Sequence, residues 1–170
     1  MRGTAAVSAA RPHDAARRAP RRPGFSFAVG VERALREHAV AALPEEACGI
    51  LVGVGVEGGW RLTRSIRCAN VAPASSRPRR FEIDPGVVIR TRRELRGGDE
   101  TIIGFYHSHP NGRCEMSATD LEYARNWPRT LWIVVPVADG SAGAPCAWQL
   151  DAPAAAPTPV PLITAAESSG

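Results

Sequence analysis

Residues 104–110 read Gly-Phe-Tyr-His-Ser-His-Pro, and this short stretch decides how the whole chain is interpreted. The apolar run at 101–106 predicts a strand, with His107 and His109 at its end. Side chains two apart on a strand point to the same side, so both imidazoles can reach one metal ion. Asp120 follows eleven residues after His109, in the first turn of a predicted helix. Two histidines and one carboxylate are a common ligand set for catalytic zinc, which leaves a fourth position for water.

The pattern Ser117-x-x-Asp120 has two interpretations. In the first, Ser117 is the N-cap of a helix and Asp120 occupies the N3 position of a capping pattern. In the second, a loop rich in glycine and polar residues folds this turn back toward the histidines, and Asp120 binds the metal. We favour the ligand because of the histidines upstream, although a capping carboxylate is less free to bind zinc. The Ser117 hydroxyl could then donate a hydrogen bond to the oxyanion of a tetrahedral intermediate.

Hydrolysis at such a metal also needs a base that takes a proton from water and passes it to the leaving amine. Glu46 is the candidate, because it stands at the mouth of the buried strand predicted at 47–52. Its neighbour Glu45 is expected to be a solvated acid at the same turn.

Charge is distributed unevenly along the chain. The net charge of +4 is the sum of +5 for residues 1–24, with six arginines and one acid, and −1 for the rest, with 15 arginines and 16 acids. A nucleic-acid-binding domain would carry a clustered basic face, so the near-neutral remainder argues against that class. No apolar stretch approaches the roughly 18 to 20 residues of a membrane span. We therefore expect a soluble protein.

Four cysteines are present, and none lies in a Cys-x-x-Cys pair, which argues against a structural zinc ribbon. An even number is compatible with two disulfides, but the leader has arginines and no apolar core of a secretory signal. We expect a cytoplasmic protein with free thiols. The cysteines are Cys48, Cys68, Cys114 and Cys146.

Strands and helices are expected to alternate, which predicts an α/β or mixed α+β fold. The chain divides into a disordered leader at 1–24, one domain at 25–150, and an Ala/Pro-rich tail at 151–170 with an edge strand at 160–164. Glycines 53, 55, 58 and 59 predict a hairpin turn. Strands are expected at 25–29, 47–52, 60–68, 81–83, 101–106, 130–137 and 146–150, and helices at 31–43, 84–96 and 117–126.

The segment Pro44-Glu-Glu46-Ala-Cys-Gly49, the His-x-His-Pro run and Ser117-x-x-Asp120 together resemble the JAMM/MPN+ metalloprotease family, over roughly residues 25–150. The resemblance extends to Phe81-Glu-Ile-Asp-Pro85, which is similar to compact bacterial members. It implies a three-layer fold related to cytidine deaminases. It also implies one zinc ion at His107, His109 and Asp120, Glu46 as general base, and Ser117 as oxyanion donor.

The same resemblance implies a peptidase that cuts an amide bond after the Gly-Gly tail of a ubiquitin-like or sulfur-carrier protein, by Glu-assisted attack of zinc-bound water. A non-catalytic module that binds such a partner is the alternative. A DNA-repair-associated relative would share His-x-His-Pro and Ser-x-x-Asp, but the near-neutral domain and the segment around Glu46 favour the peptidase. The chain lacks the His-x-Glu and Pro-Cys-x-x-Cys motifs of zinc deaminases, which excludes that class. Leaving group and oligomeric state are left open.

Cys114 departs from the family pattern, because similar bacterial proteins have small residues or proline in this loop. Its thiolate could be a fourth zinc ligand that displaces water. We favour a bystander that points away from the metal, since loop cysteines rarely act as ligands.

Overall fold

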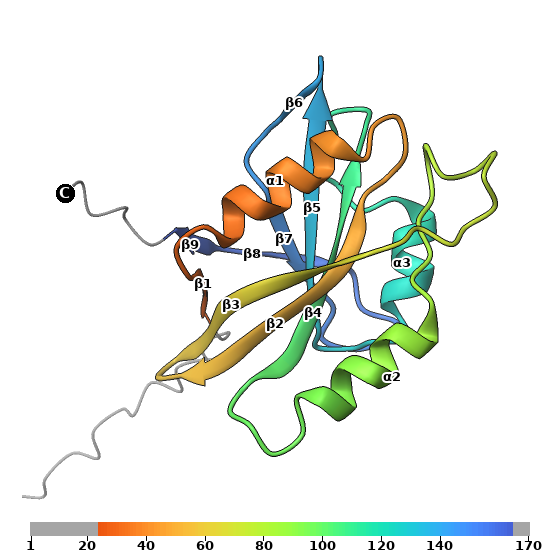
Figure 1. The fold of residues 1–170 in the computed structure, drawn as a ribbon. Helices are drawn as coiled ribbons and strands as arrows, with labels where there is room; N and C mark the ends of the chain where they lie inside the picture. The colour runs from red at the N-terminus through yellow and green to blue at the C-terminus, as the bar shows by residue number, and fades with distance from the viewer. Residues whose placement is uncertain (1–23, 165–170) are drawn as a thin grey trace, which may run out of the picture.

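The computed structural model describes residues 24–164, which form a mixed β-sheet between two helical layers (Figure 1). The elements in chain order are β1 (Gly24–Phe27), α1 (Val31–Ala41), β2 (Cys48–Val56), β3 (Gly59–Cys68), α2 (Pro85–Glu94), β4 (Thr101–His109), α3 (Ala118–Ala124), β5 (Leu131–Ala138), β6 (Ser141–Ala142), β7 (Cys146–Gln149), β8 (Thr158–Val160) and β9 (Leu162–Thr164).

The strands are hydrogen-bonded in the order β8-β7-β5-β4-β2-β3-β1-β9, with β6 paired to β5. Strand β4 lies in the middle, antiparallel to β2 and parallel to β5. Strands β8 and β9 are at opposite ends of this order, yet only Pro161 separates them in the chain. One residue spans only a few ångströms, so the two edges of the sheet approach each other at this point. The sheet is therefore strongly curved.

Each face of the sheet has its own apolar core. Helix α1 covers one face, where Leu35 and Ala39 pack with Leu51 and Tyr106. Helices α2 and α3 lie on the other face of the sheet (Figure 1). There, Val88 and other apolar side chains pack with Phe105 and Trp132 of the sheet. Alternate residues of β4 therefore face different cores, and His107 points toward the face that α2 and α3 cover.

The predicted mixed α+β fold in three layers is confirmed, and the three predicted helices form with ends that differ by a few residues. Strand β2 is longer than predicted, because it continues through Gly53 and Gly55 to Val56. A Cβ atom at Gly53 would lie 2.5 Å from the carbonyl oxygen of Arg61 on β3, so the missing side chain permits a close strand approach instead of a turn. The hairpin turns at Glu57 and Gly58, whose φ is 77°.

The short strand predicted at 81–83 is wrong. Phe81 and Ile83 are buried, but the backbone of Glu82 between them forms hydrogen bonds with a loop and not with a neighbouring strand. The N–H of Glu82 donates to the side chain of Asn70, and its carbonyl accepts from Val71. Burial of alternate apolar side chains therefore occurs here without strand pairing.

The tail differs from the prediction of one edge strand at 160–164. It contributes two short strands, β8 and β9, to opposite edges of the sheet. The predicted leader at 1–24 lies outside the described residues except for Gly24, so the division into leader, domain and tail stays a prediction. Among residues 24–164, no helix is long and apolar enough to cross a membrane.

Candidate metal centre

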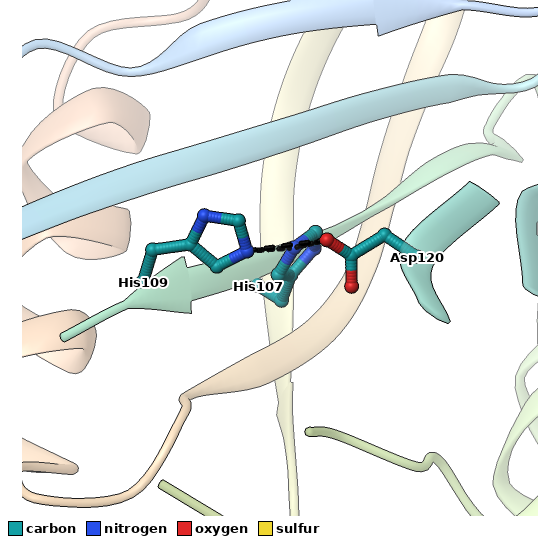
Figure 2. Close-up of side chains that lie close together, drawn as sticks. All are labelled: His107, His109 and Asp120. Atoms are coloured by element: carbon teal, nitrogen blue, oxygen red, sulfur yellow. Dashed lines mark hydrogen bonds and ion pairs between the residues drawn. The ribbon is translucent and has the colours of Figure 1, made fainter. Parts of the chain in front are cut away.

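The two histidines of the His-x-His pair lie on the last residues of β4 and point to the same side, as predicted from strand periodicity. Their Nε2 atoms are 3.1 Å apart. His107 is fully buried, and His109 is nearly so. The carboxylate of Asp120, from the first turn of α3, lies opposite both rings (Figure 2). Its Oδ2 atom is 3.3 Å from His107 Nε2 and 3.2 Å from His109 Nε2.

Asp120 caps α3 and also faces both histidines, so its position is compatible with both interpretations of the Ser-x-x-Asp pattern. The Ser117 N–H donates to Asp120 Oδ2 over 2.6 Å, and the Asp120 N–H donates to Ser117 Oγ over 3.2 Å. This reciprocal pair is a capping box that starts α3. The carboxylate oxygen that receives the capping bond is the one that faces the histidines. Capping therefore holds the Asp120 carboxylate in place opposite the imidazoles, and it does not turn the carboxylate away from them.

The three side chains fit a zinc ion. Zinc takes nitrogen and oxygen ligands at about 2.0–2.2 Å in a tetrahedron, so neighbouring ligand atoms are expected about 3.3–3.6 Å apart. The three separations observed here are 3.1, 3.3 and 3.2 Å. All three residues are buried, and they are a group within the described residues that could hold a metal ion. The structure thus supports a metal site, while the identity of the ion belongs to the proposal below.

Neighbouring groups fix the orientation of the imidazoles. Phe81 stacks on His107 with ring centroids 4.5 Å apart and planes 19° from parallel. The Nδ1 atom of His109 lies 3.1 Å from the backbone carbonyl of Arg113, which accepts its proton. That bond keeps a proton on Nδ1, so the neutral ring presents Nε2 to a metal ion, as ligating histidines require. Among the described residues, His107 Nδ1 has no hydrogen-bond partner.

Burial and mutual charge shift the pKa values of these groups. Burial lowers the pKa of His107. Burial acts the same way on His109, but the hydrogen bond and charge of Asp120 outweigh it and raise the pKa. For Asp120, burial raises the pKa, and the hydrogen bonds from the two histidines overcome this and lower it well below its usual range. The carboxylate is therefore ionised, as a metal ligand must be.

Glu46 is also buried, with 4% of its surface exposed, and it lies just before β2. The Ala47 N–H donates to Ser108 Oγ over 2.8 Å, and the Ser108 N–H donates to the carbonyl of Ala47 over 2.9 Å. These bonds hold the backbone next to Glu46 against Ser108, the residue that stands between the two histidines near the end of β4. Ser108 is a positioning residue that sequence reasoning missed; its place between the histidines was the available signal.

The Glu46 carboxylate is a strong base for a glutamate. Burial raises its pKa to about 7, while His109 lowers it and Asp120 raises it further. Its Oε2 atom has no hydrogen-bond partner among the described residues. Glu45, in contrast, is only partly buried, and its Oε1 lies 3.6 Å from Arg77 Nη1.

Asn70 holds the loop after β3 against Glu46, a role that no sequence motif indicated. Its Nδ2 donates to the carbonyls of Glu46 (3.1 Å) and Arg80 (3.0 Å). Its Oδ1 accepts from the N–H groups of Ala72 (3.1 Å) and Glu82 (3.2 Å). One amide thereby uses both donors and both acceptor positions, which joins both ends of this loop to the backbone of Glu46.

Three of the five candidate residues line a cleft of ≈ 550 Å³, and His109 joins this cleft to His107 and Asp120. Glu46, His109 and Ser117 all line it, and the remaining lining comes from the loop after β3 and the loop after β4. Because the Ser117 oxygen accepts a bond from the Asp120 N–H, its own proton is available to the cleft. The structure therefore brings together all five residues proposed from the sequence.

The expectation of free thiols is wrong for Cys114 and Cys146, which form a disulfide. The loop after β4 runs along β7, where Trp148 Nε1 donates to the Cys114 carbonyl over 2.9 Å, and the two cysteine Cα atoms are 5.7 Å apart. A sulfur in a disulfide is not a thiolate, so Cys114 is not a fourth ligand. Cys48 and Cys68 are free, as predicted. Disulfides are rare in the cytosol, so the cytoplasmic location stays a prediction.

A mixed sheet that presents a His-x-His pair to a capping aspartate matches the class of fold and site expected from the resemblance. Residues 28–151 match the family of prokaryotic homologs of the JAB domain, and the chain belongs to that family. A JAB1/MPN domain protein from Archaeoglobus fulgidus shares the fold, with TM-score 0.51 and 16% identity over 82% of this chain and 98% of that chain.

Two curated relatives are more similar in sequence. A desampylase from Haloferax volcanii is 32% identical over 101 residues, which cover 58% of this chain and 68% of the relative. The CysO-cysteine peptidase of Mycobacterium tuberculosis is 32% identical over 109 residues, which cover 64% of this chain and 67% of the relative. Both comparisons confirm the predicted family and the prediction of a hydrolase of the peptidase class.

Proposed function

We propose that the protein is a zinc-dependent peptidase that hydrolyses an amide bond after the C-terminal Gly-Gly tail of a small ubiquitin-like or sulfur-carrier protein. The observation that carries the proposal is the convergence of His107, His109 and Asp120 at separations that suit a tetrahedral ion, beside a buried carboxylate. The names of the two curated relatives support the substrate class.

His107, His109 and Asp120 would hold the zinc through their Nε2 and Oδ2 atoms, which face one another. When bound, zinc polarises a carbonyl and lowers the pKa of a water molecule toward ~7. The chain's own contribution at these positions is orientation. The capping box fixes Asp120, and the Arg113 carbonyl and the Phe81 ring fix the two imidazoles.

Glu46 would act as general base and then as general acid. It takes a proton from the attacking water, and it returns a proton to the nitrogen of the amine that leaves. A group does both well when its pKa lies near the working pH, and burial raises the pKa of Glu46 to about 7. The Oε2 atom, which has no partner within the described residues, is the free acceptor for that proton.

Ser117 would stabilise the charge that develops on the carbonyl oxygen. Its side-chain oxygen is held by the Asp120 N–H, so the hydroxyl proton is the only donor that the side chain offers to the cleft. A fixed donor of this kind costs little reorganisation during the reaction. Ser117→Ala should therefore lower kcat about 10- to 100-fold and leave the zinc content unchanged.

The proposal is tested with zinc-loaded protein and a sulfur-carrier protein that bears a C-terminal extension after Gly-Gly, with products identified by mass spectrometry. Wild type should release the extension, and chelation should stop the release. Glu46→Gln should keep stoichiometric zinc and lose turnover by at least about 100-fold, whereas Glu45→Gln, at its partly exposed neighbour, should behave as wild type. His109→Ala should lose zinc. Glu46→Gln activity within tenfold of wild type rejects the base assignment, and stoichiometric zinc in His109→Ala rejects the ligand set.

A further inference from the structure

The chain turns sharply after β4 and comes back to His109. The Gly112 N–H donates to the His109 carbonyl over 3.2 Å, which closes a β-turn over residues 109–112. Proline at the second position and glycine at the fourth are favoured in the commonest β-turn, and Pro110 and Gly112 stand there. One residue further on, the Arg113 carbonyl lies 3.1 Å from His109 Nδ1. The backbone thus leaves the metal site at His109 and returns to the same imidazole within four residues.

The side chain of Asn111 holds the backbone of this return. Its Oδ1 atom accepts from the Arg113 N–H over 3.0 Å, a bond that asparagine readily forms with the second residue after itself. On the other side of Arg113, the Cys114 carbonyl accepts from Trp148 Nε1 on β7 over 2.9 Å. The chain is therefore held both before and after the Arg113 carbonyl, and this carbonyl stays directed at the imidazole.

Two acceptors compete for the single proton of a neutral His109 ring. The Arg113 carbonyl lies at Nδ1, and Asp120 Oδ2 lies 3.2 Å from Nε2. A carboxylate is in general the stronger acceptor of the two. A proton on Nε2 would occupy the position that a metal ion needs, so metal binding favours the ring with its proton on Nδ1. The Arg113 carbonyl can hold the proton there only if it is well placed.

His107 is in the opposite situation. Its Nδ1 atom has no hydrogen-bond partner in the part of the chain that the structure describes, and its Nε2 atom lies 3.3 Å from Asp120 Oδ2. The His107 proton is therefore favoured on Nε2, where Asp120 accepts it. Because the Nε2 atoms of the two histidines are only 3.1 Å apart, a proton on each would face the other. His109 is thus the histidine of this pair that can offer an unprotonated Nε2.

We infer that Asn111 is a positioning residue of the metal centre: it keeps the Arg113 carbonyl at His109 Nδ1 and so selects the tautomer that binds a metal ion. The inference rests on the proposed zinc site and not on the proposed substrate. Asn111 acts through the backbone of Arg113 and needs no contact of its own with the ion. Because its hydrogen bond is exposed, losing that bond should disturb the fold little and should be felt at the imidazole.

The test follows the His109 tautomer and the zinc affinity in Asn111→Ala and Asn111→Asp. Alanine removes the acceptor oxygen, whereas aspartate keeps it and can form the same bond to the Arg113 N–H. In nitrogen NMR spectra of the metal-free protein at alkaline pH, wild type and Asn111→Asp should show His109 protonated on Nδ1. Asn111→Ala should show a population protonated on Nε2. In competition with a chromophoric chelator, zinc should bind about tenfold more weakly to Asn111→Ala and no more than about threefold more weakly to Asn111→Asp.

Asn126→Ala is the matched control. Asn126 is also an exposed asparagine with a bond to backbone, from its Nδ2 to the Glu122 carbonyl over 3.4 Å, and it follows the end of α3 that is opposite to Asp120. Its substitution should change neither the tautomer nor the zinc affinity. A wild-type His109 tautomer in Asn111→Ala overturns the inference, and so does a loss of zinc affinity that Asn111→Asp fails to restore.

This inference and the proposed peptidase can fail separately. If Asn111→Ala changes the tautomer and weakens zinc binding, but wild type does not cut the extended carrier protein, the inference stands and the peptidase proposal fails. If wild type cuts the carrier and Asn111→Ala keeps the wild-type tautomer and zinc affinity, the inference fails and the peptidase proposal stands. Wild type that takes up no zinc overturns both.

Discussion

Glu46→Gln should make the metal-free protein more stable at neutral and alkaline pH. Glu46 is 4% exposed, and its Oε2 atom has no hydrogen-bond partner among the described residues. Burial raises its pKa from 4.5 to about 7. A carboxyl group whose folded pKa exceeds its unfolded pKa takes up a proton on folding. Its contribution to stability is therefore complete below pH 4.5 and is lost as the pH rises through about 7.

The size of the effect follows from the shift. One pKa unit corresponds to about 1.4 kcal/mol, so ionised Glu46 lowers the free energy of unfolding by about 3 kcal/mol above pH 7. Glutamine has nearly the same shape and no charge. Glu46→Gln should match wild type near pH 4.5 and exceed its stability by about 3 kcal/mol at pH 8. A carboxylate kept at this cost is expected at a catalytic site.

The assay is urea unfolding of chelator-treated protein at several pH values, because a bound cation would favour the ionised carboxylate. The charge of Glu46 helps to raise the pKa of His109, so the titration of this coupled residue changes with the substitution, whereas groups outside the site titrate alike in both proteins. Glu45→Gln is the matched control. Its ion pair with Arg77 is partly exposed to solvent, and the effect of Glu45→Gln should stay within about 0.5 kcal/mol at every pH. A difference between Glu46→Gln and wild type that does not change with pH would refute the reasoning.

Three other changes test the surroundings of the site. Asn70→Ala removes four hydrogen bonds to the backbone. In urea unfolding it should lower the free energy of unfolding by at least about 2 kcal/mol, and it should reduce kcat while zinc stays bound. Asn70→Asp keeps the acceptor oxygen and should lose less stability in the same assay. Gly104→Ala places a Cβ atom against the Leu131 carbonyl oxygen on β5 and should lower the free energy of unfolding by at least about 2 kcal/mol. An unchanged free energy of unfolding would contradict this close approach of β4 and β5. Cys146→Ser opens a link between residues 32 apart, which should cost about 3–4 kcal/mol in the chain-entropy model, measured against wild type with and without reductant. Zinc content should survive Cys146→Ser; its loss would show that the Cys114 sulfur acts on the metal site.

The sequence was sufficient for the residues that meet at the metal centre. Strand periodicity places His107 and His109 on one side of β4, and the capping pattern places Asp120 in the first turn of α3. Both rules are local, because they depend on backbone geometry within a few residues. The sequence could not show that one Asp120 oxygen serves the cap and the histidines together, since that depends on where α3 sits against the sheet.

Patterns within a few residues predicted the structure less well where burial, or pairing with a segment distant in the sequence, decides the conformation. Glycines at 53 and 55 indicated a turn, but the neighbouring strand makes them sites of close packing within β2. The alternation at 81–83 indicated a strand, but Asn70 takes up the backbone bonds of that segment. The pairing of Cys114 with Cys146 arises because the loop after β4 runs along β7, a contact between segments far apart in the chain.

The amino-acid sequence by itself determined the family, the candidate ligand residues and the elements that carry them, because these follow from residue chemistry and from the short-range periods of strand and helix. Only the tertiary structure decided what surrounds those ligands. Burial sets the pKa of Glu46, Asn70 joins the loop after β3 to it, and Trp148 on β7 holds the loop after β4. These properties depend on which distant segments exclude water from the site together, and no local pattern records that.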